Sequence, residues 1–126
     1  SNRIDSDSDR RAALLQRGVV MARKKLWLQA LDDWREASSN LQAKLSAQDH
    51  TILRRAFAGK YGVDEVLYDP VFSVALHEFA QSDAQCAAIA RSISRGLFWR
   101  MRQAIMERQF NTAFKTAKLF MRLRRG

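Results

Sequence analysis

The chain has 126 residues, of which 47% are hydrophobic, and a formal net charge of +9 at pH 7. This length predicts one domain with a core of its own, and the hydrophobic content excludes a disordered chain. The absence of any run of about 18 apolar residues excludes a transmembrane segment. Cys86 is the only cysteine. It excludes a disulfide framework and a cysteine-based zinc site, and it favours a reducing, cytoplasmic location.

The beginning of the chain is polar and acidic, so we expect a flexible tail over residues 1–9. The first two residues are Ser1 and Asn2 rather than a methionine, so we expect a tag remnant or a domain excised from a longer protein. A single helical domain is predicted to cover residues 10–126.

The first arm of this domain is predicted as one long helix over about residues 10–46. Its apolar residues recur at alternating spacings of four and three, which is the period of a helix and not of a strand. They begin with Leu15, Val19, Ala22 and Leu26. We expect the weakest point of this helix at 38–40, where Ser-Ser-Asn could kink it.

Two short helices are predicted between the arms. Asp49 is in position to cap the first, over about 49–58, because an aspartate side chain accepts a hydrogen bond from the first turn. Pro70 is in position to start the second, over about 70–80, because the first helical residue needs no N–H donor. Residues 60–68 are predicted to form a loop.

A second long arm is predicted over residues 82–124. Ser82 and Gln85 have the spacing of a capping box at its start. Its first apolar stripe consists of residues 86, 90, 93, 97, 101, 104 and 105. Beyond 109 the stripe moves around the helix to residues 110, 113, 114, 117, 120 and 121. We therefore expect a break capped by Asn111, or else one continuous helix that changes partners there.

Together these elements predict an all-α fold. The two arms and the short helices between them form an antiparallel bundle of four to five helices. The sequence leaves open whether the arms pack within one chain or exchange between two chains of a homodimer.

The positive charge is distributed unevenly. Residues 1–90 contain 12 Lys and Arg and 12 Asp and Glu, whereas residues 91–126 contain 10 Lys and Arg against Glu107 alone. The whole excess of positive charge is therefore in the last part of the chain. Such an asymmetry favours a polyanionic or acidic partner.

Two aromatic residues interrupt this basic segment. On a helical wheel Phe98 and Trp99 lie opposite the apolar stripe, beside Arg91, Arg95 and Arg102. Three interpretations compete: the rings fill a second small core, they stack on nucleic acid between phosphate-binding arginines, or they anchor an acidic protein or an anionic membrane.

Further basic residues extend this surface in the prediction. Those of the last helix and the turn before it are Arg108, Lys115, Lys118 and Arg122. A secondary basic cluster on the first arm consists of Arg23, Lys24 and Lys25. Arginine and lysine at these positions are candidate phosphate contacts, which would make binding fall steeply with salt.

Residues with catalytic chemistry do not form a recognisable motif. His50 and His77 lie far apart in the sequence and have no cysteine or histidine at ligand spacing. Cys86 belongs to the apolar stripe, which predicts a core residue. No glycine-rich phosphate loop is present. We therefore expect no catalysis, no metal and no cofactor.

The sequence thus predicts a non-catalytic helical module that binds nucleic acid through its basic C-terminal surface, without reading the bases. The alternative is an adaptor or assembly domain that docks an acidic or helical protein. In that alternative Phe98, Trp99 and also Trp27 would anchor the partner.

Overall fold

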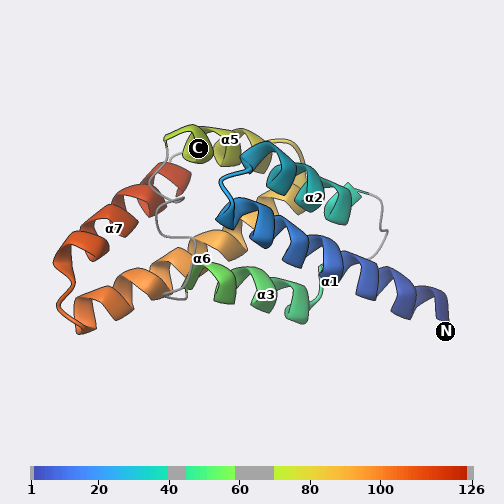
Figure 1. Ribbon diagram of the computed structural model, residues 1–126, viewed down its shortest axis with the longest axis horizontal. Coiled ribbons are helices and arrows are strands. Elements are labelled where there is room, and N and C mark those ends of the chain that lie inside the picture. The colour runs from blue at the N-terminus through green and yellow to red at the C-terminus, as the bar shows by residue number, and fades with distance from the viewer. Residues whose placement is uncertain (1, 40–44, 59–69, 125–126) are drawn as a thin grey trace.

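The computed structural model describes residues 2–39, 45–58 and 70–124 (Figure 1). These residues form helices and no strand, which confirms the all-α prediction. The helices are α1 (Asn2–Arg23), α2 (Trp27–Ser39), α3 (Ala47–Ala58), α5 (Pro70–Ala80), α6 (Ala84–Met106) and α7 (Phe110–Arg124).

Helix α6 is the central element. It contacts α2, α3, α5 and α7, while α1 packs on α2 and on α3. Figure 1 shows α6 crossing the middle of the molecule, with α7 returning beside it. The bundle arrangement is as predicted, but the described residues form six helices rather than four to five.

The first arm accounts for this difference, because it is a helical hairpin and not one helix. α1 ends at Arg23 and α2 begins at Trp27. Lys25 has a left-handed φ of 63°. The Lys25 N–H donates to the Ala22 carbonyl at 3.0 Å and the Leu26 N–H donates to the Met21 carbonyl at 3.0 Å. These two bonds form a Schellman motif, a helix C-terminus in which the left-handed residue is usually glycine.

The start of the first arm also differs from the prediction. Residues 2–9, expected to be a tail, are the first turns of α1. Residues 1–17 contain no proline or glycine that would stop a helix from extending backwards. The predicted weak point near Ser38 is where α2 ends; residues 40–44 lie outside the described residues.

The second arm breaks where the sequence predicted. α6 ends at Met106 and α7 begins at Phe110, so the continuous helix is ruled out. A second Schellman motif ends α6: Arg108 has a φ of 58°, and the Gln109 N–H donates to the Ala104 carbonyl at 2.8 Å. Asn111 is not the cap of α7, because that helix starts one residue before it.

The left-handed residue of the second motif gives a stability prediction. Replacing Arg108 with glycine is expected to raise the free energy of unfolding by about 0.5–1 kcal/mol, because glycine adopts a positive φ without a Cβ clash. Thermal unfolding followed by circular dichroism measures the change. The neighbouring Glu107 has an ordinary φ of −88°, so Glu107→Gly is the control and should lower stability. Equal effects of the two glycines would contradict this account.

The caps of α3 and α6 are each displaced from the predicted residue. Ser46 caps α3: its Oγ accepts from the Asp49 N–H at 3.1 Å, and Asp49 Oδ2 accepts from the Ser46 N–H at 2.8 Å. Asp49 thus completes a capping box rather than starting the helix. Asp83, and not Ser82, caps α6 by accepting from the Cys86 N–H at 2.8 Å. This hydrogen bond lowers the pKa of Asp83.

The core is built around Trp34 of α2, which is fully buried. Its ring centroid lies 6.1 Å from that of Phe57 in α3 and 6.5 Å from that of Phe79 in α5. Its Nε1–H donates to the Leu15 carbonyl of α1 at 3.2 Å. The indole therefore joins four helices and fixes the frame on which the C-terminal arm rests.

Candidate functional site

The two aromatic residues of the basic segment lie at the surface. Phe98 is 39% exposed and Trp99 is 52% exposed, and Arg91, Arg95 and Arg102 beside them are exposed as well. The opposite side of α6 is buried. The sequence prediction that the rings stand outside the main stripe is therefore confirmed.

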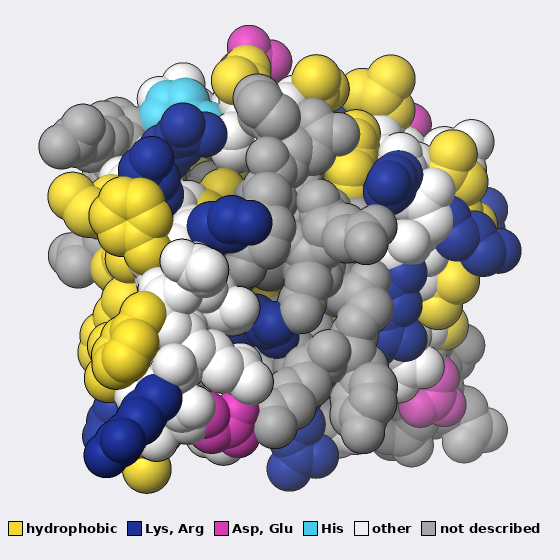
Figure 2. Space-filling model, turned by 60° about the vertical axis from the view of Figure 1, so that its left-hand side comes forward, with side chains coloured by type: hydrophobic (Ala, Val, Ile, Leu, Met, Phe, Trp, Pro, Cys, Tyr) yellow, Lys and Arg dark blue, Asp and Glu magenta, His cyan; other side chains and the backbone are white. Residues whose placement is uncertain are grey.

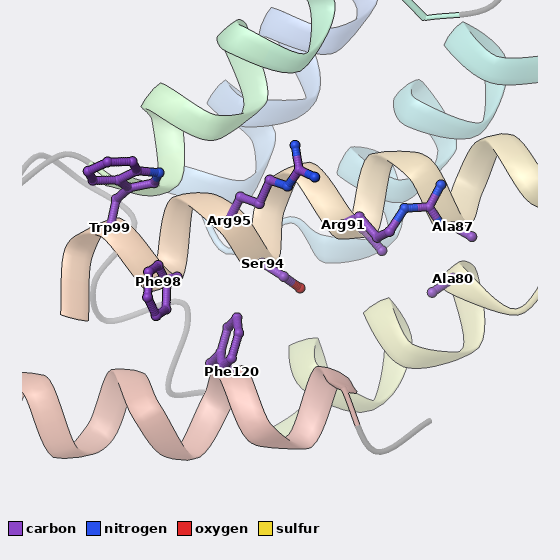
Figure 3. A pocket seen from close by; sticks show the side chains of 9 residues that line it. Ala80, Ala87, Arg91, Ser94, Arg95, Phe98, Trp99 and Phe120 are labelled. Atoms are coloured by element: carbon purple, nitrogen blue, oxygen red, sulfur yellow. The ribbon is translucent and has the colours of Figure 1, made fainter. Parts of the chain in front are cut away.

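A groove runs between α6, the end of α5 and α7 (Figure 3). We call it the apolar groove; its volume is about 570 Å³. It is lined by Ala80, Ala87, Ala90, Arg91, Ser94, Arg95, Phe98, Trp99 and Phe120. Figure 3 shows Phe98 and Phe120 pointing toward one another across it. Their ring centroids are 5.9 Å apart. Half-exposed rings and small alanines thus leave a hydrophobic hollow open to solvent.

A second hollow lies on the other side of the same arginines, between α3 and α6. We call it the basic pocket; its volume is about 430 Å³. It is lined by Ala47, His50, Thr51, Arg54, Ala88, Arg91, Ser92 and Arg95. Nδ1 of His50 and Oγ of Ser92 form a hydrogen bond that joins the two helices here. Three arginine side chains from two helices therefore line one hollow together with polar side chains.

Arg91 and Arg95 line both hollows, and we call this pair the arginine ridge. They occupy successive turns of one face of α6. Figure 3 shows the side chain of Arg95 extending from α6 toward α3. The ridge places positive charge between an apolar surface and a polar one.

None of the ion pairs among the described residues involves the arginines that line the two hollows. The ion pairs of the described residues are Arg10–Glu36, Arg11–Asp49, Arg17–Asp33 and Arg35–Asp32. All use arginines of α1 and α2. Within the described part of the chain, no carboxylate lies within ion-pair distance of Arg54, Arg91 or Arg95.

The remaining predicted contacts of the C-terminal arm are exposed, but no described contact joins them to the ridge. Arg102 lies over the Trp99 ring, with Cζ 5.3 Å from the ring centroid. Lys118 lies over Phe114, with Nζ 4.8 Å from the centroid. Arg108 occupies the turn, and Lys115 and Arg122 are on α7. Figure 2 shows Lys and Arg side chains among hydrophobic ones on this side of the molecule.

The secondary basic cluster lies at the turn between α1 and α2, where Arg23, Lys24 and Lys25 are exposed. Arg23 also lines a third hollow, between α1 and α3, together with Arg55. Arg54 and Arg55 thus face the two sides of α3. Basic side chains therefore continue from the cluster across α3 to the ridge.

Sequence reasoning missed three residues that complete the site: Arg54, His50 and Phe120. Arg54 and His50 come from α3, and 25 residues of the sequence separate the end of that helix from the start of α6. The one sequence feature that could have indicated a binding residue in α3 was the Arg54-Arg55 pair in a predicted short helix. Phe120 was assigned to the predicted stripe of α7, where it is half-buried against Phe98.

The rest of that predicted stripe is right for Ala113, which is buried, and for Ala117, which is half-buried, but wrong for its larger side chains. α7 buries Ala113, Thr116 and Leu119. Thr116 is tolerated inside because its Oγ1–H donates to the Thr112 carbonyl at 2.7 Å. The other face remains at the surface, with Phe110 63%, Phe114 62% and Met121 51% exposed.

The groups with potential for catalysis are placed as follows. Cys86 is buried, its Sγ lies 3.6 Å from Ser38 Oγ, and burial raises the pKa of its thiol. Nε2 of His77 is hydrogen-bonded to the Gln81 amide at 3.1 Å. Among the described residues, no three His, Cys, Asp or Glu side chains form a group that could hold a metal ion. A third group with acid-base chemistry in the sequence, Asp64, Glu65 and Asp69, lies outside the described residues.

The described helices include none that is long and apolar enough to cross a membrane. No family model, curated protein or solved structure matches the chain. The function therefore has to be inferred from the geometry of the α6 surface.

Proposed function

We propose that this chain is a non-catalytic helical module that binds nucleic acid through phosphate contacts, without reading the base sequence. One observation carries the proposal: Arg54, Arg91 and Arg95 from two helices line the same pocket, and no carboxylate of the described residues lies within ion-pair distance of them. Cations held close together without a counter-charge favour an external anion.

Arginine is suited to this role. Its planar guanidinium donates two parallel hydrogen bonds to a phosphate, and it is weakly hydrated for a cation. Ser92 and Thr51 in the same pocket add hydroxyl groups, which commonly contact phosphate oxygens. Phosphate contacts of this kind position a strand and carry no sequence information.

The unequal use of carboxylates supports the same conclusion. Ion-paired arginines join α1 to α2, whereas Arg54, Arg91 and Arg95 on α3 and α6 have no ion pair within the described part of the chain. An arginine needed only for solubility would have no reason to share a pocket with two others, because like charges repel at short range. Binding a polyanion removes that repulsion.

The proposal predicts a salt-dependent affinity that depends on the ridge. A labelled single strand of about 12 nucleotides is titrated at about 50 and 200 mM salt. Arg91→Gln with Arg95→Gln should weaken binding at least about tenfold and reduce the salt slope by about 0.7 for each lost phosphate contact. Fluorescence anisotropy measures both quantities.

The matched control removes the same charge elsewhere. Arg10 and Arg17 are exposed on α1 and pair with Glu36 and Asp33 of α2. Arg10→Gln with Arg17→Gln should leave the affinity within about twofold, since only the long-range field changes. Absence of binding by the unaltered protein at low salt, or equal losses in the two double variants, would contradict the proposal.

A second candidate function, docking of an acidic helical protein, is favoured by the exposed stripe of α7. Phe110, Phe114 and Met121 repeat at helical spacing beside Lys118, and large exposed apolar side chains commonly mark protein interfaces. The anchor proposed from Trp27 is wrong: that ring is buried and packs on Phe72 at 4.8 Å between centroids. The titration above separates the two candidates, because an adaptor has no affinity for the strand.

A further inference from the structure

We propose that the apolar groove receives an unstacked nucleobase, so that the ligand is single-stranded nucleic acid rather than a duplex. This inference rests on the proposed function and adds to it the part of the ligand that is not phosphate. Nothing about phosphate binding by itself requires an apolar hollow next to the arginines.

The shape of the groove fits a flat apolar group. Phe98 and Phe120 pack against one another from two helices at one end of the groove, and small side chains line its other end. Ala80, Ala87 and Ala90 come from α5 and α6, and a larger residue at any of them would fill the space. The volume of about 570 Å³ lies within the range of ligand-binding hollows.

The aromatic rings explain why a base is the preferred occupant. Every nucleobase has a π-face, so stacking on phenylalanine or tryptophan is strong and tolerant of sequence. The two rings are 5.9 Å apart between centroids and tilted by 43°, and both line the groove without being fully buried. Ser94 is the one neutral polar side chain in the lining, which is too little to distinguish the bases by hydrogen bonding.

The arginine ridge links the base to the phosphates. Arg91 and Arg95 border the apolar groove on one side and the basic pocket on the other. A strand that follows α6 therefore places its phosphates over the ridge and toward Arg54, and turns a base into the groove. A duplex keeps its bases stacked and paired inside, so it offers only phosphates to this surface.

The test distinguishes the contribution of the base to the affinity from the contribution of the phosphate charge. Affinities are measured for an oligothymidine of about 12 nucleotides, for an abasic strand of equal length and charge, and for a duplex of the same length. We expect the oligothymidine to bind at least about tenfold more tightly than the abasic strand, because a single stacked base accounts for that much. The duplex should resemble the abasic strand.

A variant that fills the groove without changing its charge provides the second part of the test. Ala87→Leu should reduce the affinity for oligothymidine to that for the abasic strand and leave abasic binding unchanged. Ala84→Leu is its matched control, because Ala84 is exposed on the same helix and does not line the groove. Circular dichroism confirms that both variants are folded.

The outcomes distinguish this inference from the proposed function. Equal, salt-dependent binding of all three ligands would overturn the base-binding groove and leave phosphate binding intact. Absence of binding to any of them would overturn both. Binding to vesicles of anionic phospholipid that Ala87→Leu abolishes, without binding to oligothymidine, would assign the groove to a lipid instead.

Discussion

Replacing Arg11 with methionine is expected to lower the free energy of unfolding by about 3–5 kcal/mol. The Arg11 side chain is 4% exposed and its Nη1 lies 3.5 Å from Oδ2 of Asp49, which is equally buried. Methionine keeps most of the volume but leaves the carboxylate in the interior without its cation, and the desolvation of that charge is then uncompensated. Urea unfolding followed by circular dichroism measures the loss.

The neighbouring residue provides the control. Arg10 pairs with Glu36 at 3.0 Å, but both side chains are largely exposed, so Arg10→Met should cost no more than about 1 kcal/mol. Adding Asp49→Asn to Arg11→Met removes the second charge and should recover part of the stability, since the asparagine oxygen still accepts the Ser46 N–H bond. A loss for Arg11→Met as small as that for Arg10→Met would contradict a buried pair.

This ion pair matters for function because it holds α3. Asp49 belongs to the capping box that starts α3 and, through Arg11, fixes that end of the helix to α1. The next residue of α3, His50, and Arg54 just over one turn further along line the basic pocket. A buried charge that costs stability when broken thus determines where the third arginine of the pocket lies.

The local sequence pattern predicted the helices well wherever the burial of the side chains follows from their spacing along one helix. The apolar stripe of α6 and the break before α7 follow from helical periodicity. The structure confirms the break and the stripe as far as Ala104, whereas Ile105 at the end of the predicted stripe is 49% exposed. The turn at Lys25 was not predictable in this way. The apolar spacing continues through it, and a lysine in place of the usual glycine gives no signal of a left-handed residue.

The candidate site could be predicted from the sequence only in part, for a related reason. The exposure of Phe98 and Trp99 follows from their angle on α6 alone. The contributions of Arg54 and Phe120 depend on which helices pack beside α6, and periodicity contains no information about partners. The exposed Phe110 and Phe114 show the same limit, because an apolar stripe predicts burial without saying whether a neighbour is present to bury it.

Gly96 lies where α6 packs closely on α3 beside Arg54. Its replacement is expected to have a large effect on stability and on binding. A Cβ at this position would lie 2.5 Å from the Arg54 carbonyl oxygen and 3.0 Å from Phe57 Cβ. The first contact is with backbone, so α3 itself has to move. Gly96→Ala is therefore expected to lower the free energy of unfolding by roughly 1–3 kcal/mol, although alanine favours a helix more than glycine does.

The same substitution should weaken nucleic-acid binding at least about threefold in protein that remains folded, because the displaced atom belongs to Arg54. Gly96 would then be a positioning residue for that arginine. A double-mutant cycle with Arg54→Gln tests this. If Gly96 acts through Arg54, Gly96→Ala has no further effect on affinity once the guanidinium is gone, although it still lowers stability. Additive losses of affinity would show instead that α6 itself is distorted, and the close approach of α3 would then have no part in placing the arginine.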